Sequence, residues 1–254
     1  MPNHIALSGD GDKARERIRN SPRILGLRVN LISAAMTELV LAIGLFLATH
    51  LLSTIGPLRN GLVRVTGQRT FMILYSLLSL AVVAWLGLAY VNAPYIELWP
   101  QLPWMRWAPL SIMPVACLLV AAGLSSPNPF SIGAGARKFD PARPGIVAVT
   151  RHPVIWGMAL WAIAHLVPNG DFASVLLFGL LLLLALIGPA SLDHKCKRTL
   201  GVEARRRLLA NTRRTPLGRA LIQIGVWRWL TAGALYAGLL AGHETVIGVI
   251  AFPV

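Results

Sequence analysis

Charged side chains are scarce in this chain. Its 254 residues are 55% hydrophobic and 13% charged, with only 10 acidic residues, whereas a soluble domain carries about 25% charged residues. Three of the acidic residues, Glu38, Glu97 and Glu244, lie near the ends of long apolar runs, where a membrane interface is expected. Those runs offer neither a carboxylate dyad nor a nucleophile–base pair, which argues against buried acid–base machinery.

Cysteine is also scarce. The two cysteines are Cys117, inside the third apolar run, and Cys196, at the foot of the fifth. We expect them to lie far apart. The sequence therefore offers neither a disulfide framework nor a CxxC pair for a metal ion.

Long apolar runs take the place of the missing charge. Each is close to the roughly 20 residues with which a helix crosses a bilayer. Six are predicted to span the membrane, at about 37–56, 71–93, 108–125, 153–168, 172–192 and 226–249. The sequence therefore predicts an all-α, polytopic membrane bundle of about six transmembrane helices, with the lipid bilayer as its partner.

The net charge of +14 is concentrated in short connections between these runs. Connections 57–70, 126–152 and 193–225 hold most of the lysine and arginine, whereas the second connection holds only Arg106 and the fourth holds none. Basic residues accumulate in cytoplasmic loops, so the odd-numbered connections are predicted to be cytoplasmic. Contact with anionic lipid accounts for such charge, and nucleic-acid binding is not expected.

The chain is predicted to divide into a basic N-terminal arm, residues 1–35, and a transmembrane domain, residues 36–254. The predicted orientation places the arm opposite the basic loops, in conflict with the charge rule. Translation that starts at Met36 would remove the conflict; otherwise the arm is disordered or forms a short basic helix on the membrane. N-terminal sequencing of the native protein distinguishes these cases, because a peptide from residues 1–35 excludes the later start.

Histidines in the apolar runs are the first candidates for a functional site, because ionisable groups are costly in hydrocarbon. His50 lies in the first run and His165 in the fourth, whereas His152 and His243 lie near the interfaces. A neutral histidine also joins helices by hydrogen bonding, which is the structural alternative for each. Two buried histidines on separate helices also raise the alternative that both ligate one metal-containing cofactor, for which His50 and His165 are the candidates.

Helix phase separates the two histidines of the segment TRHPVIWGMALWAIAH. His152 and His165 are 13 positions apart, which places them roughly 140° apart around a helix axis, so one face cannot present both. Trp161 and Gly157 share the face of His165. This face either lines a flat cofactor ring or packs against another helix.

Two arginines complete the cofactor-binding candidates. Arg59 and Arg151 are expected at the same membrane border as His50. Guanidinium groups at that level would pair with the propionates of a haem or extend to lipid phosphates.

Three segments resemble the NnrU family of membrane proteins: FLATHLLSTIGPLRNGLVRVTGQRTFMILYSLLSL, NAPYIELW and TRHPVIWGMALWAIAHLVPNGDFASVLLFG. The similarity extends from Met36 to the end of the chain. It implies a multi-pass protein of the bacterial inner (cytoplasmic) membrane that is associated with nitric oxide and nitrite reduction in denitrification. The reductase machinery is then the implied partner, and the oligomeric state is left open.

The family is in turn similar to the 15-cis-zeta-carotene isomerases, which are haem b enzymes of membranes. This similarity implies haem b as the cofactor and His50 and His165 as the iron ligands. The isomerases have small residues after the first histidine, whereas here Leu51 and Leu52 follow His50. The resemblance therefore supports the haem more than the isomerase reaction.

The segment RHPVIWG also resembles an element of membrane methyltransferases, in which the histidine helps to hold S-adenosylmethionine. That similarity implies a role for His152 and makes a methyltransferase the alternative function. Those enzymes carry a further acidic pair in the cytoplasmic segment after a later span. In the corresponding segment of this chain Glu203 stands alone among arginines, so the pair is missing. A third hypothesis is a non-enzymatic membrane assembly factor whose histidines are structural.

Overall fold

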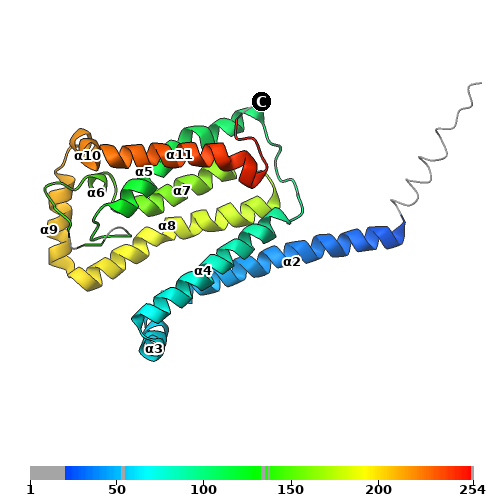
Figure 1. Ribbon diagram of the computed structural model, residues 1–254, viewed down its shortest axis with the longest axis horizontal. Coiled ribbons are helices and arrows are strands. Elements are labelled where there is room, and N and C mark those ends of the chain that lie inside the picture. The colour runs from blue at the N-terminus through cyan, green and yellow to red at the C-terminus, as the bar shows by residue number, and fades with distance from the viewer. Residues whose placement is uncertain (1–20, 53–54, 133–134, 137, 253–254) are drawn as a thin grey trace, which may run out of the picture. The chain divides into compact units, whose positions relative to one another are not determined.

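The computed structural model describes residues 21–52, 55–132, 135–136 and 138–252. Within this part of the chain the regular elements are helices, and the strand-like pairing is limited to one isolated antiparallel bridge between Glu97 and Asp171. The chain divides into two compact units, Met1–Ile96 and Glu97–Val254. Figure 1 shows the helices of both units.

The first unit consists mainly of α2 (Pro22–Leu52) and α4 (Gln68–Val91), which are connected through α3 (Gly56–Thr66). α2 and α4 pack side by side (Figure 1). The Tyr75 hydroxyl donates to the Thr49 carbonyl at 3.3 Å, and the Trp85 indole donates to the Glu38 carboxylate at 3.1 Å. Residues 22–35 of the predicted arm continue into α2, whereas residues 1–20 lie outside the described residues.

Four longer helices of the second unit form a row: α11 (Val226–Ile247), α5 (Trp107–Ser125), α7 (Pro153–Leu166) and α8 (Phe172–Leu200). Neighbours in this order are in contact, and Figure 1 shows them side by side. α7 begins at Pro153, because proline suits the first turn of a helix, where its missing N–H costs nothing.

Short helices close one end of this row. They are α6 (Ile146–Val149), α9 (Val202–Arg213) and α10 (Leu217–Ile224), and the 3-10 turn η1 (Pro103–Arg106) precedes α5. A buried apolar cluster joins them to the longer helices; it consists of Leu119, Ala122, Phe130, Ile146, Val147, Cys196 and Ile224. This core fixes the loop after α5 and the start of α7, where the RHP motif lies.

The prediction of an all-α polytopic membrane protein is confirmed. Four segments are long and apolar enough to span a bilayer by themselves: Val29–Leu51, Gln68–Val91, Pro103–Ser125 and Phe172–Leu200. α10 and α11 together form a fifth candidate that is bent by 76°. The structure differs from the prediction at the fourth span, residues 153–168. The helix there, α7, has 14 residues, which is shorter than the roughly 20 residues needed to cross hydrocarbon.

Apolar side chains cover the outer surface of these helices. On α4, for example, Leu80 is 68% exposed and Leu88 is 63% exposed. Apolar surface of this extent is stable in lipid, where the helical hydrogen bonds satisfy the backbone. Trp104 and Trp107 are also exposed, as expected for residues of an interfacial aromatic belt.

Candidate functional site

His165 lies in the last turn of α7, where its ring clusters with those of Trp161 and Phe178. Its ring centroid is 5.2 Å from that of Trp161 and 5.4 Å from that of Phe178, on which it stacks. Its Nδ1 lies 2.8 Å from the Trp161 carbonyl oxygen. Because a carbonyl oxygen only accepts, Nδ1 carries the proton of the neutral ring, and the lone pair is then on Nε2.

The end of α7 next to His165 is held by a polypeptide segment from the connection before η1. The Gly170 carbonyl accepts hydrogen bonds from the Leu98 and Trp99 amides, at 2.7 and 3.1 Å. The Trp99 indole also donates to the Val167 carbonyl, and the Asn169 side chain donates to the carbonyl of His165. These bonds fix the backbone on which the His165 ring is mounted.

His243 of α11 is a second histidine in this region. It is close enough to His165 for an electrostatic interaction between the two. Its Nδ1 lies 2.8 Å from the Val249 carbonyl oxygen, so it has the same tautomer as His165. The sequence places His243 only at an interface, and its proximity to His165 is information that only the fold provides.

The other predicted metal ligand, His50, lies in the last turn of α2. Its ring stacks on Phe46, with 5.9 Å between centroids. Arg59 of the same unit lies over the ring of Phe71, at 5.8 Å from the centroid. His50 belongs to the first unit and His165 to the second, so their joint ligation of one cofactor remains a prediction.

His152 is buried at the start of α7, with 2% of its area exposed. Its Nε2 lies 3.4 Å from Asp193 Oδ1. Asp193 also accepts from Arg205 at 2.7 Å and from Arg151 at 3.2 Å. The predicted propionate partner Arg151 is therefore already paired with a carboxylate.

Burial lowers the pKa of His152 below its ordinary value, and the charges of Arg151 and Arg205 act in the same direction. The opposing effect of Asp193 does not reverse this shift. A neutral His152 follows, held among two arginines and one aspartate. The sequence motif singles out His152 but gives no sign of Asp193, which comes 41 positions later on another helix.

The shared face of Trp161 and Gly157 is divided between two neighbours. Trp161 packs edge-on against Phe178 of α8, at 5.3 Å. Gly157 faces α5 instead: a Cβ atom there would lie 2.7 Å from Val120 Cγ2 and 3.0 Å from the Ala116 carbonyl oxygen. The glycine therefore serves the close approach of two helices, while the tryptophan shapes the surroundings of His165.

The described residues contain no group of three or more His, Cys, Asp or Glu side chains arranged for a metal ion. A haem iron needs only one or two protein ligands, because the porphyrin supplies the others. His165 and His243 each carry the proton on Nδ1, so that the lone pair of Nε2 can bind a metal ion.

Comparison with known proteins agrees with the resemblance in the sequence. The NnrU protein family model matches residues 38–251. Neither a curated protein nor a solved structure matches the chain. The match covers both units and includes His50, His152, His165 and His243, and the chain belongs to the NnrU family.

Proposed function

We propose that this protein binds haem b in the bacterial inner membrane and serves nitric oxide and nitrite reduction. His165 of α7 and His50 of α2 would hold its iron. Membership of the NnrU family supports the association with denitrification that the sequence resemblance implies. The reductase machinery is accordingly the proposed partner.

The tautomer of His165 carries this proposal. The bond from Nδ1–H to the Trp161 carbonyl leaves the Nε2 lone pair for a metal. Metal-ligating histidines commonly donate their other ring N–H to a carbonyl or carboxylate, which fixes the ring and raises its basicity. Among the described residues Nε2 of His165 has no hydrogen-bond partner.

The surroundings of His165 suit a flat apolar cofactor. Trp161 and Phe178 pack against the imidazole and cover part of it. The hydrogen bonds of Trp99 and Asn169 keep the end of α7 in place. Bound haem b supplies one-electron redox chemistry and affinity for nitric oxide.

Visible spectra of the detergent-purified protein test the proposal. Oxidised, dithionite-reduced and nitric-oxide-treated samples from haem-replete cells should show a b-type haem that responds to both treatments. His165→Ala and His50→Ala should each abolish or shift the spectrum, whereas His152→Ala should leave it unchanged. A cofactor-free preparation from such cells would overturn the proposal.

A further variant, His243→Ala, identifies the second ligand. Loss of the spectrum in His165→Ala and His243→Ala, but not in His50→Ala, would assign both ligands to the second unit. The alternative functions make different predictions. A methyltransferase that uses His152 should bind S-adenosylmethionine in calorimetry, and an assembly factor should bind neither that compound nor haem.

A further inference from the structure

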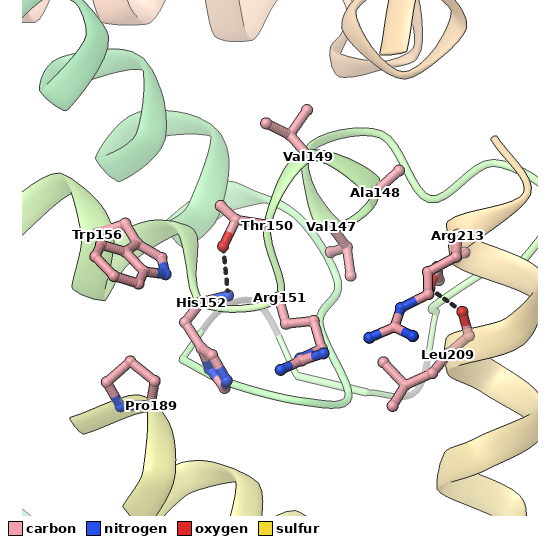
Figure 2. A pocket seen from close by; sticks show the side chains of 11 residues that line it. Val147, Ala148, Val149, Thr150, Arg151, His152, Trp156, Pro189, Leu209 and Arg213 are labelled. Atoms are coloured by element: carbon pink, nitrogen blue, oxygen red, sulfur yellow. Dashed lines mark hydrogen bonds between the residues drawn. The ribbon is translucent and has the colours of Figure 1, made fainter. Parts of the chain in front are cut away.

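A cavity of about 300 Å³ lies beside the RHP motif, away from the aromatic surroundings of His165. It is enclosed by α6, the turn before α7, Pro189 of α8 and the end of α9 (Figure 2). Its polar lining comes from Thr150, Arg151, His152, Thr212 and Arg213. Figure 2 shows the side chains of Arg151 and Arg213 extending toward each other from opposite walls.

The charges around this cavity do not balance. Asp193 is paired with both Arg151 and Arg205. Arg213 has no ion pair within the described part of the chain, where the remaining pairs join His152 to Asp193 and Arg207 to Glu203. Two guanidinium groups that approach one space repel each other, and an anion between them relieves the repulsion.

The polar lining also has unused hydrogen-bonding capacity. His152 is 2% exposed, and its Nδ1 has no hydrogen-bond partner among the described residues. The Thr150 hydroxyl accepts a bond from the His152 amide at 3.3 Å, which leaves its own hydrogen to donate. Because Nε2 faces the Asp193 carboxylate, Nδ1 of the neutral ring is an acceptor. A buried acceptor without a partner is costly and points to a missing water or ligand hydroxyl.

The remaining wall is apolar and includes Trp156 and Leu209. The cavity also lies at the expected membrane border. α8 has 29 residues, and because about 20 suffice to cross the hydrocarbon, the segment after Pro189 extends into the headgroup layer. The arginines of the cavity can therefore bind an anion, and its apolar wall can contact the apolar part of the molecule that bears the anion.

We propose that this cavity binds a phosphoryl group, held between Arg151 and Arg213 with the Thr150 hydroxyl as a further hydrogen-bond donor. A phosphoryl group presents oxygens in several directions and so suits donors from two opposite walls, whereas a carboxylate suits a single guanidinium fork. Its source is either the headgroup of an anionic lipid or free phosphate.

Two measurements distinguish the sources. In the first, inorganic phosphate is titrated into the detergent-purified full chain and binding is followed by calorimetry. In the second, the full chain is placed in nanodiscs of phosphatidylcholine with or without phosphatidylglycerol, and the lipids retained after re-extraction are identified by mass spectrometry. Phosphate binding without retained phosphatidylglycerol indicates the free anion, and selective retention of phosphatidylglycerol indicates the lipid.

Arg213→Gln is the test variant, because Arg213 is exposed and its loss should not unfold the chain. Arg214→Gln is the matched control: it is the adjacent exposed arginine and does not line the cavity. Loss of one charge-assisted contact should weaken binding about tenfold in Arg213→Gln and leave Arg214→Gln unchanged. Equal weakening in both variants, or no binding of either probe to the wild type, would overturn the proposal.

Discussion

At the residue scale, Asp193 is the side chain on which the ion-pair cluster of the second unit depends. It is the sole acidic partner in that cluster of Arg151 and Arg205. Asp193→Asn keeps the shape but leaves two partly buried guanidinium groups without a counter-charge. We expect the free energy of unfolding to fall by about 2 kcal/mol, measured by thermal or denaturant unfolding in detergent.

Glu203→Gln provides the control for this variant. Glu203 also pairs with an arginine, Arg207, at 3.1 Å, but the two side chains are 63% and 77% exposed. Exposed pairs contribute little, so the change in stability should stay within about 0.5 kcal/mol. Equal effects of the two substitutions would show that Asp193 has no special structural role.

His152 predicts a dependence of stability on pH. Its pKa is lowered in the folded chain by burial, so the unfolded chain takes up the proton first as the pH falls. Stability is therefore complete above about pH 6.5, the ordinary histidine pKa, and decreases as the pH falls below it. As the pH falls below about 6.5, the melting temperature of the wild type should therefore decrease more than that of His152→Gln.

The matched control is His194→Gln, because His194 is exposed. That variant should show the same pH dependence as the wild type, whereas His152→Gln should show a weaker one. An unchanged slope in His152→Gln would mean that His152 does not titrate differently in the folded and unfolded chains.

At the scale of elements, the contact between α5 and α7 depends on Gly157. An added Cβ atom would meet Val120 Cγ2 at 2.7 Å and the Ala116 carbonyl oxygen at 3.0 Å. Because the second of these is backbone, Gly157→Ala should separate the helices and lower the free energy of unfolding by about 1–3 kcal/mol. Thermal unfolding in detergent, followed by circular dichroism, measures this loss.

Gly179→Ala in α8 is the control, since its Cβ atom would meet nothing within 4 Å. Alanine is the better helix former, so this substitution should be neutral or stabilising by up to about 1 kcal/mol. A Gly157→Ala variant as stable as Gly179→Ala would contradict the close packing of α5 and α7.

Most elements were predictable from apolar runs and from proline. Pro153 marks the start of α7 in the sequence and in the structure. The predicted run ends at residue 168, two residues after Leu166, because Pro168, Asn169 and Gly170 mark a break in the sequence. The hydrogen bond from the Trp99 indole to the Val167 carbonyl also holds this end of α7, but it comes from a distant position and leaves no local pattern.

The candidate sites were only partly predictable, for the same reason. An intramembrane histidine is conspicuous, so His165 and its neighbour Trp161 are found from spacing on one helix. Phe178, His243 and Asp193 belong to other helices, and their proximity depends on how those helices pack. Helix phase separates His152 from His165, and the structure gives them different neighbours.

At the scale of the whole molecule, the two candidate sites of the second unit lie at opposite ends of α7. His165 and its aromatic neighbours are at the C-terminal end, and the arginine-lined cavity is at the N-terminal end. The apolar length of α7 separates them, so haem binding and phosphoryl binding are expected to be independent. Arg213→Gln should accordingly leave the haem spectrum unchanged.

The orientation of the chain in the membrane gives the last prediction. The basic connections predict that the segment with α9 is cytoplasmic and that the connection before η1 lies on the other side. Both native cysteines, Cys117 and Cys196, are buried, so the wild type should react little with a membrane-impermeant thiol reagent. Gln101→Cys and Ala204→Cys place single exposed thiols in the two regions. In intact spheroplasts Gln101→Cys should be labelled, whereas Ala204→Cys should react only after the membrane is permeabilised. The reverse pattern would place the arginine-lined cavity on the outer face, where the positive-inside rule does not allow so many basic residues.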